Sequence, residues 1–299
     1  MPTDYQALAA RTVAKRITLY EKQVTAALQR ALVEIRKDIS LAYERYAKDG
    51  FLTVADRATA ARLASVEKRV VAELDKALST NLDTMRTIHP EMYEESYMRS
   101  AWAIDQTGGI RLVYDRLNIR AIRELMASAE YSDALRRYSP VQRARIREAI
   151  NTGLVRGKGY VDMMNDLKTA LGMTRGDAFR IVRTEGQRAQ NAGNAAALAE
   201  AQGQGVEMKI AWVATLDGRT RDQHYSMDGR TRDADGVFQM PNGETTEYPL
   251  GPGLSAENSI NCRCTTRPEI VGYEPELRRT RDAGLIPYQP FTQWQPARS

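Results

Sequence analysis

The chain has 299 residues and only two cysteines, so it is long enough to fold around its own apolar core and is not a small disulfide-stapled scaffold. No apolar run approaches the ~20 residues of a membrane-spanning helix, so we expect no insertion into a membrane. The amino terminus lacks the basic and apolar segments of a secretory signal, so we expect the protein to stay in a reducing compartment. The net charge is only +5, but 34 of the 43 basic residues are arginine, which suits contacts with carboxylates or phosphates as well as a salt-bridged surface.

The first two thirds of the chain, residues 4–202, are predicted to be helical. Apolar residues recur at helical spacing over residues 5–48 and again over residues 53–89, where Pro90 is expected to end the helix. Both segments are far longer than the ~11 to 12 residues of an average helix. They predict a long helical hairpin that leads into a bundle.

Shorter helices are predicted between residues 91 and 202, separated by glycines and by helix start signals. Ser139-Pro140 combines a capping residue with a proline of the first turn, and Thr174-x-x-Asp177 resembles a capping box. The expected helices cover residues 91–106, 110–129, 140–155, 160–171 and 174–202.

The composition changes after Gly203, where turn-forming residues become frequent. Strand-like segments follow at residues 207–216, 237–240 and 263–270. Beyond Gly272 the last 27 residues contain four prolines, and we expect this tail to be disordered or to lie extended against a partner.

These patterns predict an α+β protein, with a mainly helical N-terminal two thirds and a small α+β or β-rich C-terminal domain. The predicted domains are a helical arm and bundle at residues 1–138, a domain of helices followed by short strands and turns at residues 139–272, and a proline-rich tail at residues 273–299.

The hexapeptide Asp-Gly-Arg-Thr-Arg-Asp occurs twice, at residues 217–222 and 228–233. Because Asp-Gly is a turn signal, the simplest interpretation is two polar turns that share residues. Two copies are too few for a solenoid, which needs about three repeats to bury a core.

His224 and the run Cys262-Arg263-Cys264 contain the candidate metal ligands. In an extended strand residues i and i+2 share one face, so both thiols can bind one ion while the intervening arginine faces away. Zinc favours tetrahedral Cys/His ligation, and Asp217, Asp222 or water would complete the set. The alternative is two buried, inert cysteines beside a hydrogen-bonding histidine. A disulfide is disfavoured, because an extended i, i+2 pair lies near the upper limit of Cα separation.

Several spaced motifs follow one another between residues 180 and 267. They are Arg183-Thr184-Glu185, Ala189-x-Asn191-x-Gly193, Trp212-x-Ala-Thr-Leu-Asp217-x-Arg-Thr-Arg221-x-x-His224, Asp228-Gly229 and Asn261-Cys262-Arg263-Cys264-Thr265. Their order resembles the phage Mu F-like head morphogenesis (minor capsid) family. Many relatives have Cys-x-x-Cys where this chain has Arg221-Asp-Gln-His224, and histidine where it has Ser259. The resemblance therefore leaves His224, Cys262 and Cys264 as the matching ligands and the fourth one open.

The resemblance implies that residues 139–272 are a head morphogenesis domain in a minor head protein of a tailed phage or prophage. Such a protein is assembled in the host cytoplasm, is part of the virion in few copies, and associates with the portal protein and other capsid components. In some members it contacts phage DNA. The candidate docking or DNA-binding residues are Arg183, Glu185, Arg219, Arg221 and Arg263. For Arg183 and Glu185 the alternative is ordinary surface ion pairing.

Catalysis is not expected. A metal-dependent nuclease is the sharpest enzymatic alternative, because His224 lies among Asp217, Asp222, Asp228 and Asp233 in the sequence. The second histidine, His89, lies far upstream, and neither cysteine has a recognisable acid/base set around it. Longer members of the family carry an enzymatic domain after the morphogenesis segment, and no room for one is expected here.

Overall fold

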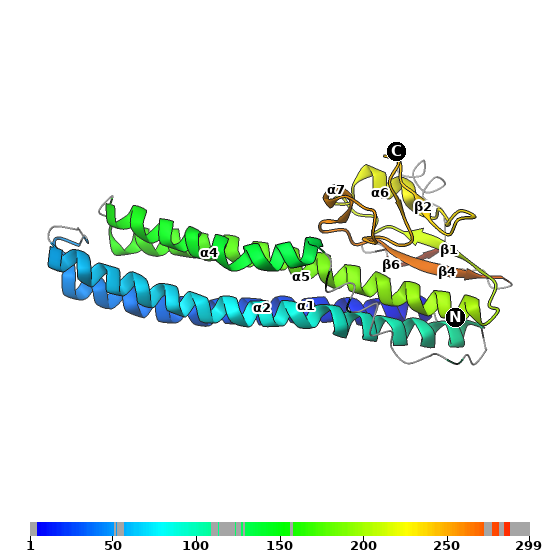
Figure 1. Cartoon of the computed structure of the whole chain (residues 1–299), viewed down its shortest axis with the longest axis horizontal. Coiled ribbons are helices and arrows are strands. Elements are labelled where there is room, and N and C mark those ends of the chain that lie inside the picture. The colour runs from blue at the N-terminus through cyan, green and yellow to red at the C-terminus, as the bar shows by residue number, and fades with distance from the viewer. Residues whose placement is uncertain are drawn as a thin grey trace. The chain divides into compact units, whose positions relative to one another are not determined.

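The computed structural model describes residues 5–50, 52, 57–108, 113, 123, 127, 129–155, 158–271, 277–280 and 284–287. Its elements in chain order are α1 (Tyr5–Tyr46), α2 (Arg57–Gly108), α4 (Ala129–Val155), α5 (Tyr160–Gly203), β1 (Met208–Val213), α6 (Asp222–Met227), β2 (Phe238–Gln239), β3 (Thr245–Thr246), α7 (Ala256–Ser259), β4 (Thr265–Ile270), β5 (Leu277–Thr280) and β6 (Gly284–Pro287) (Figure 1). Long helices precede short strands, which confirms the predicted α+β class.

The chain divides into two compact units. We call Thr18–Thr87 with Met126–Val182 the helical unit, and Met1–Ile17, Ile88–Leu125 and Arg183–Ser299 the mixed unit. Helices α1, α2 and α5 each contribute residues to both units. The units therefore follow packing and not chain order, and the domain boundaries drawn from sequence remain a prediction.

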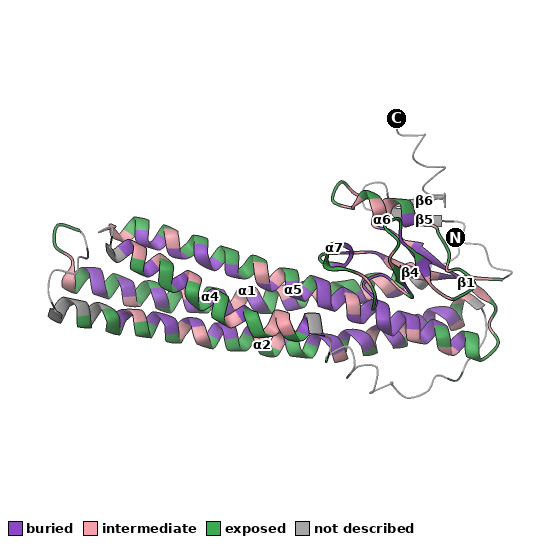
Figure 2. Cartoon of the chain, turned by 45° about the horizontal axis from the view of Figure 1, so that its top comes forward, coloured by how far each residue is buried: buried purple, intermediate pink, exposed green. Residues whose placement is uncertain are grey.

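The helical unit is a bundle in which segments of α1, α2, α4 and α5 run side by side (Figure 1). Buried and exposed residues alternate along each helix (Figure 2). The periodicity predicted for the first helix is confirmed, because Val24, Leu28 and Ile35 are all buried. A buried hydrogen bond connects α2 to α4, where the side-chain amide of Asn81 donates to the Tyr138 hydroxyl at 3.0 Å.

The helix end predicted at Pro90 and the helix start predicted at Ser139-Pro140 are both wrong, since α2 continues through Pro90 and α4 continues through Pro140. An interior proline costs a helix ~3 kcal/mol because it removes one backbone donor. The side chains of Ile88 and Met92 are fully buried on either side of Pro90, and this packing offsets the local loss. The helix predicted over residues 110–129 lies almost entirely outside the described residues.

The break predicted at Gly172 is also absent, because α5 runs without interruption from Tyr160 to Gly203. An interior glycine costs only ~1 kcal/mol, whereas Leu171 and Ala178 are buried on the same helix. Thr174, the expected cap, donates instead to the carbonyl oxygen of Ala170 at 2.9 Å. None of the described helices combines the length and apolarity of a membrane span.

The strands form three antiparallel pairs, β1 with β4, β2 with β3 and β5 with β6. Met208 pairs with Ile270 and Val213 with Thr265, so β1 and β4 match along their full length. This confirms the strands predicted at residues 207–216 and 263–270, while the one at 237–240 is shorter than predicted. Residues 277–280 and 284–287 differ from the expected tail, since they form the antiparallel pair of β5 and β6.

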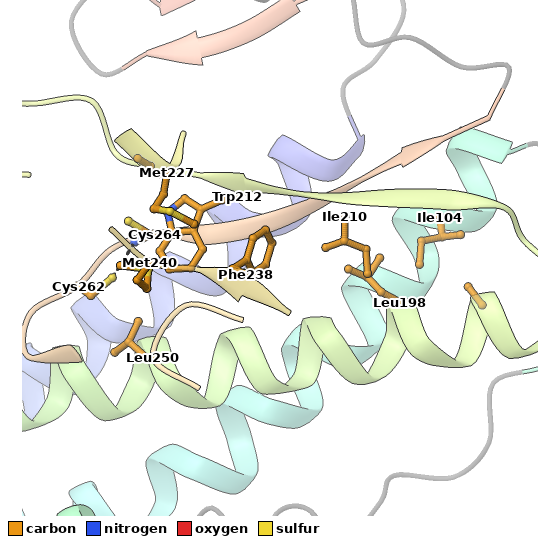
Figure 3. Close-up of a cluster of buried hydrophobic side chains, with 12 residues drawn as sticks. Ile104, Leu198, Ile210, Trp212, Met227, Phe238, Met240, Leu250, Cys262 and Cys264 are labelled. Carbon is orange, nitrogen blue, oxygen red and sulfur yellow. Dashed lines mark hydrogen bonds between the residues drawn. The ribbon is translucent and has the colours of Figure 1, made fainter. Parts of the chain in front are cut away.

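The core of the mixed unit lies between the β1–β4 pair and helix α5 (Figure 3). Its buried members are Ile104, Leu198, Ala201, Ile210, Trp212, Ala214, Met227, Phe238, Met240, Leu250, Cys262 and Cys264. The ring of Trp212 meets the ring of Phe238 edge to face, with centroids 5.2 Å apart. Both cysteines are therefore part of the core against which β1 and β4 pack.

Candidate metal centre

His224 is brought into the core by the short helix α6. The first hexapeptide forms a turn in which Asp217 accepts a hydrogen bond from the backbone of Arg219 at 3.0 Å. Helix α6 begins immediately after this turn and buries His224 and Met227 on one face. The His224 ring also meets the Trp212 ring edge to face at 6.0 Å, so packing fixes its orientation.

The two cysteines lie immediately before β4. Asn261 adopts a left-handed conformation with φ of 56°, and the backbone amide of Cys262 then donates to the carbonyl oxygen of Ser259 at 3.0 Å. Both thiols are buried, whereas Arg263 between them is partly exposed and binds Asp217. The alternation predicted for Cys-x-Cys is therefore what the structure shows.

The imidazole and the two thiols converge. The Nδ1 atom of His224 lies 3.5 Å from Sγ of Cys262 and 3.3 Å from Sγ of Cys264, and all three residues are buried. Their ligand atoms lie within 4.8 Å of one another. Nitrogen and sulfur ligands of one tetrahedral zinc ion are about 3.5 Å apart at usual bond lengths. This group could hold a metal ion.

The thiols interact strongly even without an ion. The hydrogen bond between the two sulfur atoms lowers the pKa of Cys262 to about 5, against the effect of burial. The same hydrogen bond, together with burial, raises the pKa of Cys264. Cys262 is therefore the more readily ionised of the two, and the thiolate is the form that binds metals.

The two acids considered as a fourth ligand lie outside this group. The carboxylate of Asp217 accepts two hydrogen bonds from Arg263, at 2.5 and 2.7 Å, and these hold its pKa well below the usual range. Asp222 is exposed in the first turn of α6. Ser259, which the sequence argument did not select, is buried, and its hydroxyl has no hydrogen-bond partner among the described residues.

The second hexapeptide is also structural. Asp228 accepts a hydrogen bond from the backbone of Ala214 at 2.8 Å, and Asp233 accepts from the backbone of Asp235 and Val237 at 3.0 and 3.1 Å. Its acids therefore stabilise loops and do not join His224 in a common site within the described part of the chain. The arrangement that a metal-dependent nuclease requires is not formed by these residues.

The three side chains of the Arg183-Thr184-Glu185 segment lie in different environments. Arg183 is exposed, and the Thr184 hydroxyl accepts a hydrogen bond from the backbone of Asn261 at 3.0 Å. Glu185 is buried, and its carboxylate lies 3.0 Å from Nε2 of His89 on helix α2. Thr184 therefore docks α5 beside the cysteines, while Glu185 pairs within the helices and not at the surface.

Side-chain amides on α5 attach this helix to the strand that follows the cysteines. Asn191 donates to the carbonyl oxygens of Cys264 and Pro249, at 2.9 and 2.8 Å. Asn194 donates to the carbonyl oxygen of Thr266 at 3.0 Å. The glycine of the same motif, Gly193, lies against the backbone of α2, where any side chain would collide. These contacts hold α5 against the segment that follows the cysteines and against α2.

The remaining candidate binding residues differ in their exposure and in the groups that they contact. Arg219 is largely exposed, and its guanidinium lies 3.8 Å from Asp217. Arg221 donates to the carbonyl oxygen of Ile260 at 2.7 Å, and Arg263 is held by Asp217. Arg183 and Arg219 are therefore the two most exposed of these cations.

Residues 144–267 match the protein family described as Phage Mu protein F like protein. The chain is 29% identical over 287 residues to minor head protein GP7 of Bacillus phage SPP1, covering 93% of this chain and 92% of that protein. It is 26% identical over 279 residues to NAD(+)--arginine ADP-ribosyltransferase EFV of Enterococcus faecalis, covering 92% of this chain but 56% of the transferase. A stretch of 61 residues is 36% identical to uncharacterized protein YqbB of Bacillus subtilis. No solved structure matches the chain.

Proposed function

We propose that the protein is a minor head protein of the phage Mu F-like family that acts in phage head morphogenesis, because residues 144–267 match that family. The observation that carries the proposal is the similarity to the SPP1 minor head protein, which extends over nearly all of both chains. The protein is then a component of the virion and associates with other capsid components.

Within the particle, we propose that the protein docks near the portal vertex during assembly in the host cytoplasm. The exposed arginines Arg183 and Arg219 support an interface with acidic groups of a portal ring. The test is to express the chain with the portal protein of the same phage and to measure how much of it copurifies. Copurification should fall in the Arg183→Glu/Arg219→Glu double variant, and equal recovery of both chains would contradict this docking surface.

DNA is the alternative partner for the same arginines. Contacts with phosphates release counterions, so binding would weaken steeply as salt rises. Measuring the affinity of the isolated chain for duplex DNA at several salt concentrations separates the two partners. Binding to portal without measurable binding to DNA at low salt would favour portal docking.

We propose that the chain has no catalytic role of its own. The similarity that extends over nearly all of both proteins is the one to the minor head protein, whereas the chain covers 56% of the transferase. Incubation with labelled NAD+ and an arginine-rich acceptor protein should therefore transfer no label. Transfer above that of a heat-inactivated sample would overturn this assignment.

We propose that His224, Cys262 and Cys264 bind zinc. The distances among their ligand atoms, their burial and the readily ionised Cys262 all support this assignment. The fourth ligand would be water or an oxygen of the chain, and the unpartnered hydroxyl of Ser259, three residues before Cys262, is a candidate that fits a polar ligand. When bound, zinc would crosslink α6 to the start of β4. Elemental analysis of freshly purified protein should find about one zinc per chain, and its absence would refute the proposal.

A further inference from the structure

The ring nitrogen of His224 that faces away from the thiols is also bonded. Its Nε2 atom lies 3.2 Å from Oδ1 of Asn258, a residue of helix α7 that is 1% exposed. The other side-chain atom of Asn258, Nδ2, donates to Oε2 of Glu244 at 2.8 Å. Glu244 also accepts from the backbone of Ser255 at 3.2 Å, which fixes the carboxylate. A continuous series of polar contacts therefore connects Glu244 through Asn258 to His224 and the thiols.

The donors and acceptors in this series of hydrogen bonds determine which ring nitrogen of His224 carries the hydrogen. The hydrogen bond from Asn258, followed by that from Ser255, lowers the pKa of Glu244, so this carboxylate is ionised and only accepts. Asn258 must then turn its amide nitrogen toward Glu244 and its oxygen toward His224. Because an amide oxygen also only accepts, Nε2 of His224 must carry the hydrogen.

The consequence concerns the atom that faces the cysteines. A neutral imidazole carries one ring hydrogen, so a hydrogen on Nε2 leaves Nδ1 with a free electron pair. Nδ1 is the atom that lies 3.5 and 3.3 Å from the two sulfur atoms. The ring is thus prepared as a metal ligand before any ion arrives.

We propose that Glu244 and Asn258 are positioning residues that hold His224 in the Nε2-protonated form, so that it binds the metal through Nδ1. This inference rests on the proposed zinc site. Partners of this kind typically change metal affinity ~10- to 100-fold, because they orient the ligand ring and raise its basicity. Neither residue contacts the ion itself.

The first experiment needs no metal. The chain contains only two histidines, so selective nitrogen-15 labelling of histidine gives four ring nitrogen signals, and the His224→Gln variant identifies those of His224. Long-range proton–nitrogen correlation spectra of the metal-free protein near pH 8 should show Nε2 protonated and Nδ1 unprotonated. The opposite tautomer, or an even mixture of both, would overturn the proposal.

The second experiment tests ligation. In protein loaded with cadmium-113, the one-bond cadmium–nitrogen coupling should appear on Nδ1 of His224, and coupling to Nε2 would overturn the proposal. If the wild-type chain takes up neither cadmium nor zinc, the zinc site itself is refuted, and the tautomer measured in the first experiment still decides whether Glu244 and Asn258 orient the ring.

The third experiment measures zinc affinity by competition with a chelator. Asn258→Ala should weaken binding ~10- to 100-fold. The double variant Glu244→Gln/Asn258→Asp keeps both hydrogen bonds. The new amide at position 244 donates to the new carboxylate at position 258, and this carboxylate still accepts from Nε2 of His224. The zinc affinity of this variant should stay within several-fold of wild type. Asn194→Ala is the matched control, because it removes another buried amide of the mixed unit that bonds to Thr266 instead. Equal zinc affinities in Asn258→Ala and wild type would contradict the role of Asn258.

Discussion

His89 and Glu185 form a buried pair between helices α2 and α5, with Nε2 of the histidine 3.0 Å from Oε2 of the glutamate. The His89 side chain is fully buried and that of Glu185 is 5% exposed. Arg188 approaches the same carboxylate oxygen at 3.3 Å. Glu185 therefore balances two cationic or hydrogen-bonding groups at once, and its removal leaves both without this acceptor.

Glu185→Ala should lower the free energy of unfolding by about 3 kcal/mol, because breaking a buried pair leaves the remaining partner uncompensated. Arg183→Ala is the control, since it replaces an exposed residue two positions away and should stay within ~0.5 kcal/mol of wild type. Urea denaturation followed by circular dichroism measures both. Equal losses for the two variants would contradict the importance of the buried pair.

Gly193→Ala should destabilise the chain by about 3 kcal/mol or more, because the new methyl group would collide with the backbone of Tyr93 on α2, which cannot move away as a flexible side chain could. Gly176→Ala on the same helix meets open space and should stabilise by ~0.5 to 1 kcal/mol. Thermal denaturation of the two variants tests this contrast. A neutral Gly193→Ala would show that α2 and α5 do not approach as closely as described.

Asp217→Asn should lower the free energy of unfolding by ~1 to 3 kcal/mol at neutral pH, because it breaks a charge-assisted pair with Arg263. The folded pKa of Asp217 is depressed, so its contribution is complete above the unfolded value near ~4 and is lost as the pH falls through the lower folded pKa. The difference between wild type and variant should thus be constant from pH 7 to 5 and shrink below pH 4. A difference that grows toward acid would contradict the ion pair.

Removing zinc should lower the stability of the mixed unit. Wild type in free zinc at ~100 times the dissociation constant should gain ~2.7 kcal/mol over the chelated protein. The Cys262→Ser/Cys264→Ser variant lacks both sulfur ligands and should respond to neither zinc nor chelator. Calorimetric scans with and without chelator measure the effect, and a zinc-dependent shift of equal size in the double variant would place the metal elsewhere.

Part of the fold could be read directly from local patterns. The apolar spacing of α1 follows from periodicity, and the shared face of the two thiols follows from the alternation of side chains along an extended chain. His224 was selected as their partner by residue type alone. The continuity of α2 through Pro90 could not be predicted from the sequence, because the penalty of a proline or glycine is local while the packing that offsets it is tertiary. A sequence reading of such long helices needs to weigh the apolar face on both sides of a break signal.

The supporting contacts of the site were also beyond sequence reasoning. Glu244 and Asn258 carry no recognisable motif, and they meet His224 only because α6, α7 and the β2–β3 pair fold onto one another. The aspartates of the repeated hexapeptide are attractive ligands by residue type, yet the oxygens of Asp217, Asp228 and Asp233 accept hydrogen bonds from an arginine side chain or from backbone amides. A competing partner of this kind is visible only in three dimensions.

The most direct measurement is quantitative mass spectrometry of heads purified from cells that produce this phage. If the chain is a minor head protein, its peptides should cosediment with the portal protein, at a copy number far below that of the major capsid protein. They should also remain bound after a salt wash that removes adsorbed proteins. Procapsids and mature particles that contain portal but none of this chain would contradict the assignment.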